Sequence, residues 1–330
     1  MSRSRKLVIR GDAVPGPFGT RRVLAHGFAG LGEGRSVAQA ASDGDTVAVR
    51  ALANISVRFL GVDAPETKVT LPDAPDRFIP TDDPAVAAFL DEPLAGFPPP
   101  RDGAEWMYRE WLRTRLGTGR GGALGANHRR HALAAERGLE AMMTADAAAF
   151  AGGDSAALVL HLAYGNDVFD RYGRLLAFLN AAVEERARRP PTYNERLLAA
   201  GLLLPYFIWP NQQPFLGIAA ADAAPAPAEF PAWLGSPQGL PLAKARGAVA
   251  AARAGGLGVF APADPLLLDA SELRLLTGHR WPERRVINLA APGGVLLAAS
   301  AYPSVERPED RLYVPREYEA LFAARGWRLA

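Results

Sequence analysis

Apolar and polar residues alternate in two short segments, residues 46–50 and 55–60, and this alternation is the pattern of half-buried β-strands. The Ala-Leu-Ala-Asn segment that separates them suits a hairpin connection. Apolar runs over residues 157–164 and 174–179 predict two further strands, and residues 167–173 carry the signals of a turn. The pattern therefore predicts an early hairpin and, much later in the chain, a second pair of strands.

Apolar residues at helical spacing predict helices over three other segments, residues 128–150, 193–200 and 242–254. Gly201 directly follows the second of these helices, where a glycine is a good stop signal. A shorter helix is predicted over residues 105–113.

That shorter helix lies inside residues 68–126, where prolines recur and where the sequence predicts a long excursion from a compact domain. Such an excursion could form a lid, a specificity wall, a partner surface or a block over a neighbouring site. Trp106 and Trp111 would anchor it to the body of the protein in preference to stacking on bases. Residues 219–232 indicate a linker or a surface loop, and residues 263–330 alternate helix and strand character without a motif.

Composition excludes several classes of protein. The chain has 330 residues and no cysteine, so it has no disulfide framework, cysteine nucleophile or thiolate metal site. Its formal charge of +2 argues against a binder driven by a basic tail, although a local basic groove is compatible with it. Neither a secretion signal nor an apolar run of about 20 residues is evident, so we expect a cytoplasmic protein without a membrane contact.

Four acidic residues, Asp43, Asp45, Asp63 and Glu66, flank the two strands of the predicted hairpin. The start of one hairpin strand lies beside the end of its partner, so Asp45 and Asp63 are expected at the same end of the sheet. Carboxylates that gather at one point repel one another unless a cation or hydrogen-bond donors compensate. A donor set made only of oxygen atoms favours Ca²⁺ or Mg²⁺ over zinc.

Two arginines complete a candidate phosphodiester site. Arg58 lies on the second predicted strand, and Arg174 opens a later one. Their guanidinium groups can neutralise phosphate charge, while a carboxylate that does not bind the metal can activate water.

Four blocks that occur in a fixed order carry a resemblance to a known family. They are Asp43-Gly-Asp-Thr46, Val57-Arg-Phe-Leu-Gly-Val-Asp-Ala-Pro-Glu-Thr67, Asp170-Arg-Tyr-Gly-Arg174 and Asn194-Glu-Arg-Leu-Leu-Ala-Ala-Gly-Leu202. With these blocks the chain resembles the staphylococcal-nuclease family over residues 37–66 and 127–262. The four together are far more specific than any one of them.

The resemblance implies an α+β fold, a five-stranded OB-type β-barrel with flanking helices. Residues 37–262 would form the nuclease-like domain, with residues 68–126 as a long insertion. Residues 1–36 would be an N-terminal extension, and residues 263–330 a C-terminal extension of unknown role. The implied activity is calcium-dependent hydrolysis of phosphodiester bonds in DNA, RNA or both.

The resemblance also implies roles for single residues. Asp45 and Asp63 would bind Ca²⁺ through their carboxylates, and Ala64 through its backbone carbonyl. Glu66 would act as general base, while Arg58 and Arg174 would bind the scissile phosphate. Arg171 and Tyr172 would contact the nucleotide, Asp43 and Thr46 would lie beside the metal ligands, and Phe207 and Trp209 would lie either near a base or in the core.

Two alternatives stay open beside this reading. His128 and His131 have a spacing that can bind a metal on a helix, but an exposed, arginine-rich helix start is favoured. The protein could also be a catalytically silent nuclease-like module that serves as a scaffold for nucleic acid or protein. Degenerate copies of such a domain typically lose the carboxylates or arginines, and all of them are present here, which favours the enzyme.

Overall fold

The computed structural model describes residues 56–117, 120–170, 173–212 and 224–330, and four short strands nearer the N-terminus. The chain divides into two compact units. The first comprises residues 1–59 and 167–177, and the second comprises residues 60–166 and 178–330.

In the first unit, β1 (Ala13–Pro15) pairs with β2 (Arg21–Val23), and β3 (Ala29–Leu31) pairs with β4 (Val49–Ala51), both antiparallel. β5 (Val57–Phe59) runs parallel to the first residues of β10 (Leu175–Ala181). Among the described residues, the partner of β4 is thus β3, whereas the predicted hairpin places it beside β5. The other residues of that predicted strand, 46–48, lie outside the described part of the chain.

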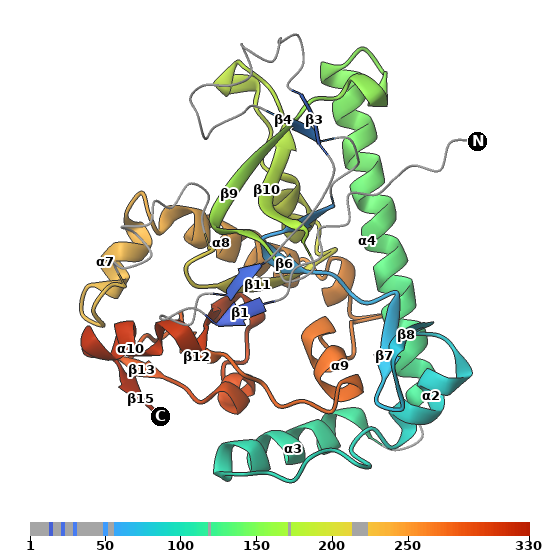
Figure 1. The fold of residues 1–330 in the computed structure, drawn as a ribbon, viewed down its shortest axis with the longest axis vertical. Helices are drawn as coiled ribbons and strands as arrows, with labels where there is room; N and C mark the ends of the chain where they lie inside the picture. The colour runs from blue at the N-terminus through green and yellow to red at the C-terminus, as the bar shows by residue number, and fades with distance from the viewer. Residues whose placement is uncertain are drawn as a thin grey trace. The chain divides into compact units, whose positions relative to one another are not determined.

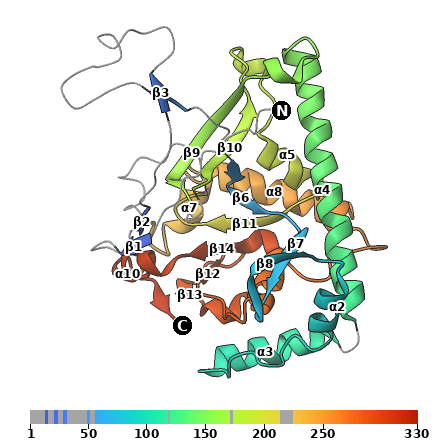
Figure 2. The ribbon, with the colours of Figure 1, turned by 45° about the vertical axis from the view of Figure 1, so that its right-hand side comes forward.

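A four-stranded sheet organises the second unit (Figure 2), in the order β12-β14-β11-β6. β6 (Gly61–Asp63) is antiparallel to β11 (Leu204–Ile208), which is parallel to β14 (Arg311–Val314), and β14 is antiparallel to β12 (Arg285–Asn288). The C-terminal segment therefore extends the sheet that begins with β6. The remaining strands are β7 (Lys68–Leu71), β8 (Ala74–Pro80), β9 (Leu160–Phe169), β13 (Val295–Leu296) and β15 (Arg328–Leu329).

Capping residues explain where several of the described helices begin (Figures 1 and 2). Asp83 caps the helix that opens with Pro84, and Thr192 forms a capping box with Glu195. The helices are α2 (Pro84–Asp91), α3 (Gly103–Leu116), α4 (Gly121–Phe150), α5 (Tyr193–Ala199), α7 (Phe230–Gly235), α8 (Leu240–Ala254), α9 (Ala270–Thr277) and α10 (Arg316–Ala324). Short 3₁₀ turns cover Ser155–Ala157, Arg186–Arg188, Gly258–Phe260, Ala299–Ser304 and Pro308–Asp310.

The predicted α+β class is confirmed, because the described residues form both helices and strands. The helices predicted over residues 193–200 and 242–254 match α5 and α8, while α4 begins at Gly121, before its predicted start. None of the sheets in the described ranges closes into a barrel. None of the described helices is both long and apolar enough to cross a membrane.

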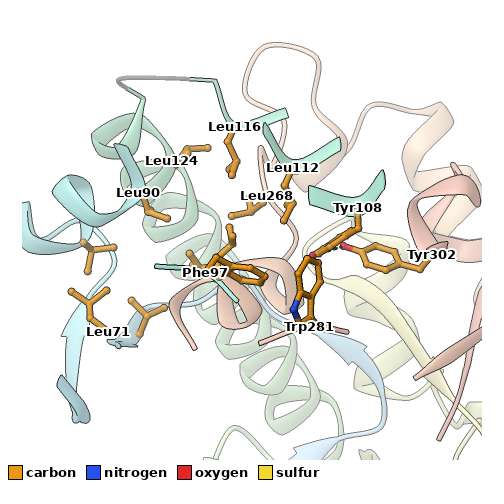
Figure 3. Close-up of a cluster of buried hydrophobic side chains, with 14 of the residues drawn as sticks. Leu71, Leu90, Phe97, Tyr108, Leu112, Leu116, Leu124, Leu268, Trp281 and Tyr302 are labelled. Atoms are coloured by element: carbon orange, nitrogen blue, oxygen red, sulfur yellow. Dashed lines mark hydrogen bonds between the residues drawn. The ribbon is translucent and has the colours of Figure 1, made fainter. Parts of the chain in front are cut away.

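The described residues of the segment 68–126 are a folded part of the second unit, whereas the sequence predicts a long excursion. They form β7, β8, α2, α3 and the start of α4, and their apolar side chains share one core with those of the C-terminal segment (Figure 3). Tyr108 packs against Trp281 and Tyr302 in this core, and Trp111 stacks on Tyr108. The segment 68–126 is therefore held by residues, Trp281 and Tyr302, that follow it by more than 150 positions in the sequence.

Phe207 and Trp209 also lie in the core, which decides between their two predicted places. Both are almost fully buried, and Trp209 makes an edge-to-face contact with Phe322 at 5.3 Å between ring centroids. Trp106 is 58% exposed, so of the two tryptophans of α3 only Trp111 anchors the insertion.

Candidate functional site

Asp63 ends strand β6, and the packing of that strand fixes the position of its carboxylate. The residue is only 2% exposed. Just before β6, the Asn194 side chain donates to the Leu60 carbonyl at 2.8 Å and accepts from the Leu179 amide at 3.0 Å. A buried amide with both functions satisfied is a strong local constraint. Asn194 in the fourth sequence block therefore helps to hold the strand that carries Asp63.

Glu66 follows in irregular backbone, and its main chain is held from two sides. Its amide donates to His128 Nδ1 at 3.2 Å, and its carbonyl accepts from the Thr81 hydroxyl at 3.3 Å. These bonds use only main-chain atoms, so they fix the backbone of Glu66 without involving its carboxylate. Its side chain remains 24% exposed.

Arg274 on α9 binds both carboxylates. Its Nη2 lies 2.7 Å from Asp63 Oδ2 and its Nη1 lies 3.1 Å from Asp63 Oδ1, so this pair is bidentate. The same Nη1 also donates to Glu66 Oε1. Burial disfavours the charge of Arg274, but Asp63 and Glu66 outweigh it and raise the pKa of the guanidinium. The predicted carboxylate pair thus converges on a single cationic nitrogen.

His128 lies behind this pair and is buried, which corrects the predicted exposed helix start. Its Nδ1 accepts from the Glu66 amide, so its Nε2 carries the proton and donates to the Leu268 carbonyl at 2.7 Å. His131 points to a different partner, with Nε2 3.8 Å from Asp264. The two histidines therefore do not form a shared metal site. His128 joins the turn of Glu66 to the segment that precedes α9.

Burial lowers the pKa of His128 from its ordinary 6.5 to about 4. Because the unfolded chain binds the proton more tightly, the stability due to the neutral imidazole is present above about pH 6.5 and is lost as the pH falls towards 4. We expect wild type to lose about 3 kcal/mol of unfolding free energy relative to His128→Gln over this interval. Urea unfolding of both proteins at several pH values measures this difference. A constant difference would contradict a buried neutral His128.

The N-terminus of α9 is anchored by a buried ionic network. Asp269 and Glu272 form a capping box, in which the Asp269 amide donates to Glu272 Oε2 at 2.8 Å. Arg115 on α3 lies 3.4 Å from Asp269 and 3.3 Å from Glu272, and the Tyr302 hydroxyl donates to Glu272 at 2.7 Å. Burial and the neighbouring Asp269 carboxylate raise the pKa of Glu272 to about 7. Helix α3 thus helps to position the helix that carries Arg274.

Arg58 and Arg174 belong to the first unit. Arg58 lies opposite Leu176 in the parallel pairing of β5 and β10. Asp170 accepts from the Arg174 backbone amide at 2.9 Å and from its Nε at 2.6 Å. Asp170 therefore orients the guanidinium of Arg174, a role that the sequence analysis did not assign. The position of Asp170 in the Asp-Arg-Tyr-Gly-Arg block was the sequence signal that could have indicated this role.

The other predicted site residues lie outside the described part of the chain. They are Asp43, Asp45, Thr46, Arg171 and Tyr172. The backbone of Ala64 is described, between Asp63 and Glu66.

The described donors suit a hard cation in kind. Asp63 and Glu66 supply carboxylate oxygens and already meet at one positive group. Within the described ranges, however, no three His, Asp or Glu side chains gather as a metal site. In the described part of the chain, Arg274 is the positive group that holds these two carboxylates together.

Sequence reasoning missed Arg274, and it placed His128 on an exposed helix start where the structure buries it beside Glu66. Arg274 lies 208 positions from Glu66, in a segment without a recognisable motif. The capping box of Asp269 and Glu272 marks the start of a helix in the sequence, but not where that helix packs.

Comparison with known proteins adds no identification. No family model matches the chain, and neither a curated protein nor a solved structure matches it.

Proposed function

We infer that this protein is a calcium-dependent nuclease that hydrolyses phosphodiester bonds of DNA, RNA or both. In this proposal, residues 37–66 and 127–262 form a five-stranded OB-type barrel with flanking helices. The observation that carries the proposal is the convergence of the Asp63 and Glu66 carboxylates on one cationic nitrogen. Two predicted site residues therefore share one point, and a cation is stable there.

The chain's own residues would divide the work. Asp45, Asp63 and the Ala64 carbonyl would hold the ion, and Ca²⁺ when bound would neutralise negative charge on the phosphate. Glu66 would take the proton of the attacking water, since its backbone is fixed and its carboxylate is partly exposed.

The remaining predicted residues would act on the substrate. Arg58 and Arg174 would bind the phosphate and stabilise its added charge in the transition state, with Asp170 orienting Arg174. Arg171 and Tyr172 would contact the nucleotide.

Digestion of supercoiled plasmid and of single-stranded RNA tests this proposal. With the purified full chain, we expect cleavage in Ca²⁺ and none in EDTA. A preparation from a strain that carries an empty vector controls for contaminating nucleases. Absence of metal-dependent cleavage of both substrates would contradict the proposal.

The bidentate pair between Arg274 and Asp63 favours a second candidate, a catalytically silent nuclease-like module. A guanidinium that permanently neutralises Asp63 would take the place of the ion. Such a module would bind nucleic acid or protein without cleaving it. Retention of labelled DNA or RNA in a gel shift, together with intact substrate in the digestion assay, would select this alternative.

A further inference from the structure

A cavity of about 180 Å³ lies in the second unit, and none of its lining residues belongs to the candidate site described above. Its walls come from the start of α3, the start of β12, the 3₁₀ turn Ala299–Ser304 and α10. Four segments that are distant in the sequence therefore meet there. At about 30 Å³ for each water molecule, the cavity has the volume of about six waters, so it suits a small ligand.

The charged side chains of this cavity give it a negative balance. Four carboxylates face two guanidinium groups, which leaves a difference of two negative charges: Asp102, Glu105, Glu283 and Glu319 against Arg101 and Arg285. Both arginines already have a partner within the cavity. Arg101 Nε lies 2.9 Å from Glu105 Oε1, and Arg285 Nε lies 3.1 Å from Glu319 Oε2.

The other two carboxylates have no cation beside them. In the described chain, neither Asp102 nor Glu283 forms an ion pair. Asp102 caps α3, because its Oδ1 accepts from the Glu105 amide at 2.9 Å, and its Oδ2 is left for a further donor. Glu283 is exposed. A cavity lined mainly by one sign of charge attracts ligands of the opposite sign, so a cation is favoured here.

Ser300 gives an independent indication of a polar ligand. The residue is only 5% exposed, and its hydroxyl makes no hydrogen bond within the described chain. Because this oxygen is not one of the fully enclosed polar atoms, its accessible part faces the cavity that Ser300 lines. Buried polar groups nearly always have a partner, and a hydroxyl can both donate and accept. A polar group of a ligand would supply the missing partner.

The rest of the lining is small and apolar, and consists of Ala104, Pro282, Ala298 and Ala299. A short hydrocarbon chain with a charged end matches such a mixed lining. A primary ammonium group has three donors, and carboxylates and a hydroxyl are acceptors for it. A divalent metal ion fits less well, since it takes about six oxygen ligands and the described side chains form no cluster of three metal ligands.

We propose that this cavity binds a small aliphatic amine, and that the carboxylates of Asp102 and Glu283 and the hydroxyl of Ser300 hold its ammonium group. The alanines and Pro282 contact its hydrocarbon chain. The inference does not depend on the proposed function. It gives α3, which the sequence analysis placed in an excursion, a role in ligand binding.

Calorimetric titration of putrescine, a linear aliphatic diamine, into the full chain tests the proposal. In about 0.05 M salt we expect a Kd between about 0.1 and 1 mM, because so small a ligand makes few contacts. Butanediol, which carries hydroxyl groups in place of the ammonium groups, should not bind measurably. Nα-acetyl-lysine amide presents the ammonium group of a protein side chain. It should bind more weakly than putrescine, because its amide groups exceed the volume of the cavity.

Three variants remove the ligand contacts without loss of a structural bond. Asp102→Asn keeps a helix cap of similar strength, Glu283→Gln changes an exposed residue, and Ser300→Ala deletes a hydroxyl without a partner in the described chain. Each should raise the Kd for putrescine about threefold to fivefold. The double variant Asp102→Asn/Glu283→Gln should raise it at least about tenfold.

Glu140→Gln is a matched control. Glu140 is an exposed carboxylate on α4, a helix that contributes no residue to the lining of the cavity. The substitution makes the same change of charge as Glu283→Gln, and the Kd should equal that of wild type. Circular dichroism and melting temperatures establish that each variant is folded before the titration.

Absence of putrescine binding at about 10 mM would overturn the proposal. A Kd that all three site variants leave unchanged would also overturn it, because the amine would then bind elsewhere. Equal binding of butanediol would show that charge is not recognised. Tighter binding of Nα-acetyl-lysine amide than of putrescine would replace the free amine by the lysine of a protein partner. A Kd that rises in the site variants and not in Glu140→Gln supports the proposal.

Discussion

Replacement of Glu66 by glutamine is expected to lower the rate of nucleic-acid cleavage at least about 100-fold, because an amide cannot take a proton from water. The fold should be retained. The contacts that hold this turn, to His128 and Thr81, use backbone atoms of Glu66, and a glutamine oxygen can still accept from Arg274. Initial rates on plasmid at saturating Ca²⁺, with melting temperatures of both proteins, measure the effect.

Glu110→Gln provides the control, since Glu110 is an exposed partner of Arg113 on α3 and lies far from Glu66 in sequence. It should cleave as wild type does.

Arg174→Ala is expected to resemble Glu66→Gln, because it removes the guanidinium that Asp170 orients. Undiminished cleavage by either purified site variant would rule out the assigned roles.

Local signals were sufficient for the elements whose ends are set by nearby residues. Helix α5 begins at a capping box of Thr192 and Glu195 and is followed by Gly201, which has a positive φ of 66°. Strand β10 coincides with the apolar run over residues 174–179 that predicted it. The turn with Asp63 and Glu66 was located by its block of residues. For α5 the determining contacts lie within a few positions along the chain, whereas the turn with Asp63 and Glu66 is also held by the distant His128.

The insertion shows where local reasoning was too coarse. Prolines suggested irregular structure, yet Pro84 opens α2 behind its cap Asp83, and Asp102 caps α3. Proline in the first turn of a helix is favourable, so these signals were present and were given too little weight. What the sequence could not provide is the partner of these helices, because Leu268 and Trp281 of their shared core lie far downstream.

The environment of the site depends on contacts of the same long range. His128 is buried because the Leu268 carbonyl and the Glu66 amide meet at its ring, from segments 140 and 62 positions away. Arg274 reaches Asp63 across 211 positions. Spacing within a motif identifies chemical groups, but it does not show which distant charge will neutralise them.

The anchoring network of α9 should respond to mutation far more strongly than the surface charges of α3. Arg115→Met removes the cation that faces Asp269 and Glu272 and keeps much of the apolar length of the side chain. Glu272 is fully buried and takes up a proton when it loses its cationic partner, so the change should cost up to about 2 kcal/mol of unfolding free energy at about pH 8.5 and less at neutral pH. Arg113→Met, two positions away in an exposed ion pair with Glu110, should cost less than about 1 kcal/mol.

The pH dependence of this loss identifies its cause. The pKa of Glu272 is about 7 in the folded protein and 4.5 ordinarily, so the stability that it contributes is full below 4.5 and is lost as the pH rises through 7. Arg115 lowers that pKa, and its removal should extend the loss to higher pH. The difference between wild type and Arg115→Met in urea unfolding should therefore be largest near about pH 8.5 and shrink towards about pH 5.5, where Glu272 is protonated in both proteins. A penalty that is equal at both pH values would mean that Arg115 stabilises α9 by packing alone, because packing does not change when a buried carboxylate takes up a proton.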